Sequence, residues 1–159
     1  MRDTQSMERD HIEILMIEDS PPDAELATQA FRKNRLANKI QIVQDGREAL
    51  DYLFCSGAHS GRTPAHMPVL ILLDLKLPGM DGIEVLREIR LDPRTKNLPV
   101  IVMTSSKGEQ DVVRTSKLGI NGYILKPVDY NQFVDTVNRL TVSWLILDAP
   151  LAEEVFSEK

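Results

Sequence analysis

The sequence predicts an α/β protein built on a five-stranded parallel sheet with helices on both faces. The unbroken apolar run VLILLD at 69–74 is typical of a strand buried on both faces, as in parallel sheets that helices cover. Four other short apolar or alternating segments are each followed by a stretch with helical spacing. Such alternation implies parallel strands joined by right-handed crossovers, and 159 residues suit one domain.

The chain begins with a polar, charged segment at 1–11, which we expect to be a flexible tail. The first strand is the apolar run IEILMI at 12–17, and it is followed by Glu18 and Asp19. A helix then begins, because Ser20 can cap its first turn and the next two residues are prolines. The apolar residues of this helix recur on one face at Ala24, Ala27 and Phe31.

The middle of the chain holds the second and third strands. KIQIV at 39–43 alternates apolar and polar residues and predicts a strand, and a short helix is expected at 46–54. Two glycines and two prolines make 56–68 a long loop before the third strand at 69–74. Turn residues follow that strand, and a helix is expected at 82–90.

The last two strands are also followed by helical patterns. PVIVM at 99–103 predicts the fourth strand, which ends on Thr104, and a weakly amphipathic helix is expected at 108–118. GYIL at 122–125 predicts the fifth strand, and Lys126 follows it directly. Each strand therefore leads into a helix, as the parallel arrangement requires.

Composition restricts the classes of function. The net charge is −5 and no block of Lys and Arg occurs, so nucleic-acid binding has little electrostatic support. No apolar run approaches the ~20 residues that span a membrane, and the single Cys55 cannot form an internal disulfide. We therefore expect a cytoplasmic protein with one domain at 12–147, flanked by tails at 1–11 and 148–159.

Polar side chains follow or end four of the five predicted strands. These residues are Glu18 and Asp19, Asp74, Thr104 and Lys126. The carboxyl ends of parallel strands share one edge of the sheet, where open α/β sheets bind ligands. Clustered carboxylates favour a hard cation such as Mg²⁺, an ammonium and a hydroxyl can bind phosphoryl oxygens, and an aspartate can itself become phosphorylated.

Each of these residues has an ordinary explanation when it is taken alone. An acidic pair is usually a solvated part of a loop, and Lys126 is most simply a surface charge. Thr104 and Asp74 could each cap the helix that follows. Their joint occurrence, each at the end of its own strand, favours a single site instead.

The motifs that carry these residues resemble those of the receiver domain of bacterial two-component response regulators. The resemblance covers about residues 10–145 and implies a flavodoxin-like fold with strand order 2-1-3-4-5. It rests on ED at 18–19, LD at 73–74 with PGMDG at 78–82, MTS at 103–105 and KP at 126–127.

The resemblance also implies how the site works. Asp74 would accept a phosphoryl group from the phosphohistidine of a histidine kinase. The Mg²⁺ ligands would be Glu18, Asp19, Asp74 and the backbone carbonyl of Lys76. Glu18 is a departure, because many receivers have an aspartate there; glutamate keeps the charge and can reach the metal through water.

The resemblance further implies that three residues bind the phosphoryl group or transmit phosphorylation to the surface. Thr104 and Lys126 would bind the phosphoryl oxygens. Tyr123 matches the switch aromatic of the family, which turns inward when Thr104 moves toward the phosphate. The peptide bond between Lys126 and Pro127 would be cis.

Three features narrow the resemblance to the small response regulators that partner bacterial phytochrome kinases. They are the long loop at 56–68, SPPD at 20–23 and the ending WLILDAP at 144–150. The expected partner is therefore a histidine kinase, with the phytochrome type as the first candidate. The sequence names neither the kinase itself nor the downstream target.

Two other classes of function compete with a stand-alone phosphoacceptor that relays a signal by a conformational change. A metal-dependent phosphatase also uses an aspartate nucleophile, but it usually has a second aspartate two residues later, where this chain has Lys76. A pseudo-receiver scaffold would lack one of the five key residues, and none is missing. We therefore expect a signalling protein that catalyses only its own phosphotransfer and autodephosphorylation and is not otherwise an enzyme. We also expect no output domain.

The final helix, expected at about 130–147, carries one continuous apolar seam. Its members recur at spacings of four and three residues: Phe133, Val137, Leu140, Trp144 and Leu147. Part of the seam must pack the helix on its own sheet, and the simplest alternative is that all of it is core. The apolar residues are densest at the C-terminal end, so we expect a symmetric homodimer through this helix.

Overall fold

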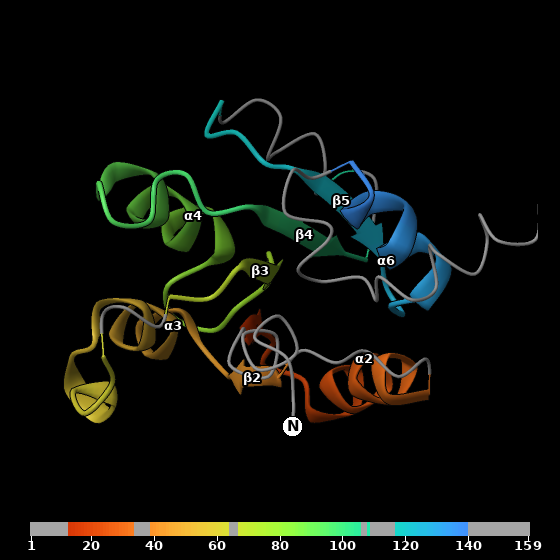
Figure 1. Ribbon diagram of the computed structural model, residues 1–159, viewed down its shortest axis with the longest axis horizontal. Helices are drawn as coiled ribbons and strands as arrows, with labels where there is room; N and C mark the ends of the chain where they lie inside the picture. Colours follow the sequence, from red (N-terminus) through yellow and green to blue (C-terminus); the bar gives the residue numbers. More distant parts are fainter. Residues whose placement is uncertain (1–12, 34–38, 64–66, 106–107, 109–116, 140–159) are drawn as a thin grey trace, which may run out of the picture.

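Five parallel strands form one sheet in the order β2-β1-β3-β4-β5, which confirms the predicted topology (Figure 1). The structure is a computed structural model that describes residues 13–33, 39–63, 67–105, 108 and 117–139. The strands are β1 (Glu13–Ile17), β2 (Lys39–Val43), β3 (Leu70–Asp74), β4 (Val100–Thr104) and β5 (Gly122–Leu125). Every residue of β3 and β4 is buried, whereas the alternating strand β2 lies at an edge of the sheet.

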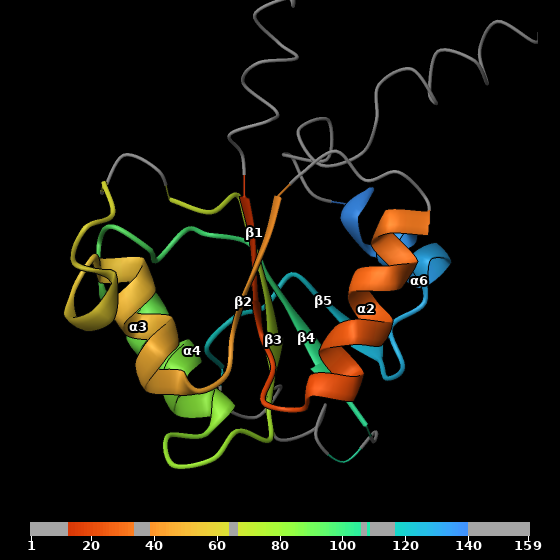
Figure 2. The ribbon, with the colours of Figure 1, turned by 90° about the horizontal axis from the view of Figure 1, so that it is seen from below.

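Helices cover both faces of the sheet, which is why its central strands are apolar on both sides. α3 (Gly46–Phe54) and α4 (Gly82–Leu91) lie on one face, and α2 (Pro21–Lys33) and α6 (Tyr130–Val137) lie on the other (Figure 2). A short 3-10 helix, η1 (Gly57–His59), follows α3. Within the described ranges, no helix is long and apolar enough to cross a membrane.

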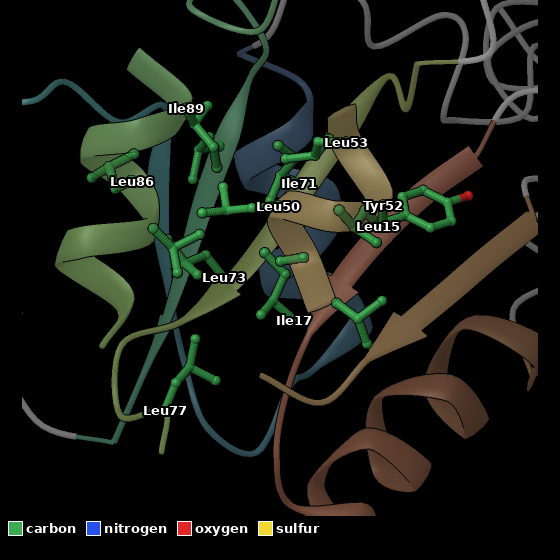
Figure 3. Packing of buried hydrophobic residues seen from close by; sticks show 14 of the residues in the cluster. Leu15, Ile17, Leu50, Tyr52, Leu53, Ile71, Leu73, Leu77, Leu86 and Ile89 are labelled. Atoms are coloured by element: carbon green, nitrogen blue, oxygen red, sulfur yellow. The ribbon is translucent and has the colours of Figure 1, made fainter. Parts of the chain in front are cut away.

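Alternate residues of the strands enter two separate cores, one on each face of the sheet. The core under α3 and α4 contains side chains from both the strands and the helices (Figure 3): Leu15, Ile17, Ile71, Leu73, Leu50, Leu53, Leu86 and Ile89. The core under α2 and α6 contains Ile14, Met16, Leu70, Leu72, Phe31 and Phe133. In that second core, the ring centroids of Phe31 and Phe133 are 4.6 Å apart, so the two helices pack directly on each other.

Most predicted strand and helix boundaries agree with the structure to within one residue. The exception is the final helix, which ends at Val137 and is followed by a turn at 138–139. The last turn tightens there, because the Arg139 N–H donates to the Thr136 carbonyl three residues earlier. Residues 140–147 of the predicted helix, and 109–116 of the helix predicted at 108–118, lie outside the described residues.

The first part of the long connection between α3 and β3 is fixed by Arg62. Its guanidinium lies 3.6 Å from the centroid of the Tyr52 ring and donates to the Tyr52 carbonyl oxygen. The Tyr52 hydroxyl in turn donates to the carboxylate of Glu13 at the start of β1, and Lys39 pairs with Glu13 at 3.5 Å. These contacts lie at the edge of the sheet where the strands begin.

Candidate functional site

The carboxyl ends of the strands bring the predicted site residues to one edge of the sheet. Ile17 of β1 is aligned with Leu73 of β3, so the next residues, Glu18 and Asp74, are also neighbours. The connections that leave β1 and β3 both turn at the lower edge in Figure 2. The predicted site residues at this edge are Glu18, Asp19, Asp74, Thr104 and Lys126.

Three carboxylates lie together at this edge. One oxygen atom each from Glu18, Asp19 and Asp74 lies within 4.8 Å of the other two. Glu18 and Asp74 are only 2% and 4% exposed, whereas Asp19 is exposed to solvent. Carboxylates this close repel one another, and oxygen ligands of this kind suit a hard divalent cation. The donor set therefore fits Mg²⁺, as the sequence predicts.

Lys126 partly neutralises this cluster. Its Nζ atom lies 2.6 Å from Glu18 Oε1 and 3.1 Å from Asp74 Oδ2, and its own side chain is 14% exposed. The Lys126 backbone N–H donates to the Thr104 carbonyl at 2.8 Å, which continues the pairing of β5 with β4 past the end of the strand. Parallel pairing thus holds the ammonium beside the two buried carboxylates.

A third partner of the Lys126 ammonium, which the sequence did not predict, comes from α2. Asp23, in the first turn of α2, places its Oδ2 atom 3.2 Å from the Lys126 Nζ. Its signal in the sequence was weak, because an aspartate in a first helical turn is explained by the helix dipole alone. The predicted cap at Ser20 is confirmed, since the Asp23 N–H donates to Ser20 Oγ at 3.3 Å.

Burial and the neighbouring charges shift the protonation equilibria of the site in opposite directions. Burial raises the pKa of Glu18 to about 7; the hydrogen bond with Lys126 opposes this shift, and the Asp74 carboxylate adds to it. Burial alone would lower the pKa of Lys126, but the hydrogen bonds to Glu18 and Asp74 hold that pKa above its ordinary value. The ammonium is therefore charged at neutral pH, while Glu18 is near its midpoint.

The turn after β3 fixes the Asp74 side chain. The Lys76 backbone N–H donates to Asp74 Oδ1 at 3.1 Å. A Cβ atom on Gly82 would lie 2.6 Å from the Leu75 Cα and 2.7 Å from the Asp74 carbonyl oxygen, so only glycine fits there without displacement. The close approach of α4 to the end of β3 thereby determines the position of the backbone at Asp74.

The other predicted residues lie around this centre. Thr104 is fully buried at the end of β4. Tyr123, on β5, is half-buried and packs against the core under α3 and α4. The peptide bond between Lys126 and Pro127 is cis, as expected. The switch role of Tyr123 and the metal contact of the Lys76 carbonyl stay predictions.

A family model for the response regulator receiver domain matches residues 14–138. The chain belongs to this receiver domain family. The receiver is 36% identical over 132 residues to the probable methanogenesis regulatory protein FilR2 of Methanothrix harundinacea, which is 83% of each chain. It is 35% identical over 132 residues to response regulator Rcp1 of Synechocystis, which is 83% of this chain and 88% of Rcp1.

Solved structures give the same family and a narrower group of neighbours. The bacteriophytochrome response regulator AtBRR is 44% identical to this receiver, with a TM-score of 0.80 over 86% of this chain and 97% of AtBRR. The Mn²⁺-bound form of Rcp1 is 34% identical, with a TM-score of 0.66 and coverage of 84% and 94%. The phosphorylated cyanobacterial phytochrome response regulator RcpA is 36% identical, with a TM-score of 0.67 and coverage of 85% and 94%.

Family membership decides between the alternatives that the sequence left open. The receiver fold and the response-regulator function are confirmed, and the phosphatase alternative has no support among the relatives. The acidic pocket of receiver domains binds Mg²⁺ or Mn²⁺, and the carboxylate cluster of this receiver has the matching donor set. The protein is therefore a receiver-domain signalling protein whose carboxylate cluster offers the donor set of a divalent-cation site.

Proposed function

We propose that this receiver takes a phosphoryl group from a histidine kinase onto Asp74. The observation that carries the proposal is the position of Asp74, a buried carboxylate held between a second buried carboxylate and an ammonium 3.1 Å away. Such a carboxylate is fixed in one orientation, and it lies at the loop edge of the sheet. It also has a cation at hand to offset the charge of an incoming phosphoryl group.

In the proposed reaction a carboxylate oxygen of Asp74 attacks the phosphorus of a phosphohistidine. The new bond joins that oxygen to phosphorus, the phosphorus–nitrogen bond breaks, and the imidazole nitrogen leaves with the electron pair. Mg²⁺, when bound, neutralises the carboxylates and the phosphoryl oxygens. Glu18 and Asp19 would hold it together with Asp74 and the Lys76 carbonyl, while Lys126 and Thr104 would bind the phosphoryl oxygens.

The output of the reaction is a change of conformation around Thr104 and Tyr123. Thr104 is buried at the end of β4, and Tyr123 lies on the adjacent strand β5, so a shift of one reaches the other through a single pair of strands. Movement of the Thr104 hydroxyl toward the phosphoryl group would leave space that the half-buried Tyr123 ring can enter. The surface around β5 would then differ between the two states.

The proposed phosphate donor is a kinase of the phytochrome type in the cytoplasm. Support comes from AtBRR and RcpA, which are both named as phytochrome response regulators and match nearly all of their length to this chain. The relative FilR2 has a different regulatory name at similar identity. Phosphotransfer from a panel of purified kinases, with a phytochrome kinase included, tests the pairing, and transfer only from another class would contradict it.

We also propose a symmetric homodimer. Its support is the apolar sequence around Trp144 and Leu147, which continues the seam of the final helix. Phe133 and Val137, the first members of the seam, are fully buried in the core under α2 and α6, so they are not available to a partner. The dimer would therefore use the later part of the seam, and phosphorylation would adjust it through β5, which contacts α6.

The phosphoacceptor is tested with acetyl phosphate as donor and intact mass as readout. We expect the wild type to gain one phosphoryl group with Mg²⁺ and to gain almost none with excess chelator. Asp74→Asn keeps the shape of the side chain but loses the nucleophile, so it should not be labelled. Asp135→Asn, an exposed aspartate on α6, is the matched control and should be labelled like the wild type. Labelling of Asp74→Asn would mean another acceptor, and labelling in chelator would contradict the metal site.

A further inference from the structure

Two overlapping groups of carboxylates surround the same edge of the sheet. The candidate metal cluster consists of Glu18, Asp19 and Asp74. The partners of the Lys126 ammonium are Glu18, Asp74 and Asp23. Glu18 and Asp74 belong to both groups, so a cation bound by them competes with Lys126 for the same carboxylates. Asp23 is the partner of Lys126 that lies outside the metal cluster.

Asp23 differs from the other two partners in its surroundings. Its side chain is 40% exposed, compared with 2% for Glu18 and 6% for Asp74. It stands on α2 and not at the end of a strand, and its backbone is held by the Ser20 side chain. A contact with the exposed carboxylate is solvated and easily broken, whereas buried contacts of the same ammonium are stronger.

We propose that Asp23 is a positioning residue that holds Lys126 over Asp74 while a divalent cation occupies Glu18 and Asp74. The inference rests on the proposed phosphoacceptor function of Asp74. When the cation takes the two buried carboxylates, the ammonium loses its two closest partners and keeps the third. When Lys126 binds the phosphoryl oxygens, it then has to give up only its weak, exposed contact with Asp23.

In this proposal the Asp23 carboxylate affects Mg²⁺ affinity through its contact with Lys126. Direct attraction between Asp23 and Mg²⁺ would also affect it, and a double-mutant cycle separates the two contributions. Mg²⁺ affinity is measured by calorimetry for the wild type, Asp23→Asn, Lys126→Gln and the double variant. We expect Asp23→Asn to weaken Mg²⁺ binding in the wild-type background. The loss should exceed the loss in the Lys126→Gln background by at least about threefold, a coupling usual for members of one ion-pair network.

A matched control removes a charge from the same helix without touching Lys126. Glu25 lies two residues further along α2, and its carboxylate accepts a hydrogen bond from Gln29. Glu25→Gln should change the Mg²⁺ affinity by less than about twofold in both backgrounds, as expected for an exposed charge. Equal losses for Asp23→Asn with and without Lys126 would overturn the inference, because Asp23 would then act only by its own charge.

A second measurement does not depend on the folding of a Lys126 variant. The Lys126 ammonium of the Mg²⁺-loaded wild type should give a protected ¹H–¹⁵N signal, and Asp23→Asn should lose that signal while Glu25→Gln keeps it. A signal that survives in Asp23→Asn would overturn the inference. If the wild type binds Mg²⁺ and is labelled on Asp74, such a result leaves the proposed function intact. A wild type that binds no Mg²⁺ would instead refute the metal site together with this inference.

Discussion

At the scale of single residues, the charge of Glu18 depends strongly on its surroundings. Burial and the Asp74 carboxylate raise its pKa to about 7 in the metal-free site, against the attraction of Lys126. A metal ligand must be deprotonated, so the proton on Glu18 competes with the cation. The affinity of the site for Mg²⁺ should therefore depend on pH in a range where ordinary carboxylates do not titrate.

We predict that Mg²⁺ affinity rises with pH up to about 7 and is flat above it. Below that pH, binding releases the Glu18 proton, so the affinity should change by up to about tenfold per pH unit. Calorimetry between pH 5.5 and 8.5 measures this. Glu18→Gln should bind Mg²⁺ more weakly and lose the pH dependence in that range. A wild-type profile without a slope would contradict the assigned protonation of Glu18.

The same shift has a consequence for the stability of the metal-free protein. The folded pKa of Glu18 lies above its ordinary value of 4.5, so the folded state binds the proton more tightly than the unfolded chain. Glu18 therefore favours the folded state fully below about pH 4.5, and this contribution falls as the pH rises to about 7. Denaturant unfolding of the wild type in chelator should show this loss relative to Glu18→Gln.

At the scale of elements, the contact between α4 and β3 leaves no space for a side chain at Gly82. Gly82→Ala would place a methyl group against backbone atoms of Leu75 and Asp74, which cannot move as a flexible side chain would. We predict a loss of about 1–3 kcal/mol of unfolding free energy, the range for overpacking. Gly61→Ala is the control, since a Cβ at Gly61 meets no atom within 4 Å.

Denaturant unfolding checks this prediction, and phosphorylation by acetyl phosphate adds a second readout. Because Gly82 contacts the backbone at Asp74, the rate of phosphorylation should fall in Gly82→Ala and stay unchanged in Gly61→Ala. Equal stabilities of the two variants would show that the start of α4 can shift away from β3. The position of Asp74 would then depend less on α4 than its distances indicate.

The sequence predicts the strands better than the end of the last helix, and the reason is physical. A run such as VLILLD must be buried on both faces of the sheet. Its length and its polar last residue therefore fix where the strand begins and ends to within about one residue. The end of α6 depends on a local tightening of hydrogen bonds at 138–139, which no apolar pattern records. Apolar periodicity continues beyond Val137 whether or not the helix does.

In the candidate site, too, the sequence predicts the position of some residues and not of others. Glu18, Asp74 and Lys126 were predictable because parallel strands bring their carboxyl ends to one edge, whatever the loops do. Asp23 was not, because its contact with Lys126 depends on how α2 packs against the sheet. A residue on a helix can be placed only when the crossing of helix and sheet is known, and the sequence does not contain that angle.

At the scale of the whole molecule, we predict a homodimer that depends on Trp144 and Leu147. Sedimentation of the wild type should give twice the monomer mass at tens of micromolar, where a Kd of about 1 μM is saturated. Trp144→Ala combined with Leu147→Ala should give the monomer. Leu26→Ala, which shortens an apolar side chain that is 48% exposed on α2, is the control and should remain dimeric. A monomeric wild type would contradict the dimer and would mean that the seam only packs in the core of its own chain.

The anchoring of Arg62 on Tyr52, whose hydroxyl in turn donates to Glu13, has a consequence for how the chain can be engineered. It fastens the connection between α3 and β3 at the edge where strands begin, far from the acidic pocket where they end. The edge of the sheet that holds the carboxylate cluster is therefore distinct from the edge at which the connection between α3 and β3 is anchored. Residues inserted just beyond Arg62, such as a reporter peptide, should be tolerated, because the anchored part of the connection precedes them and the pocket depends on neither.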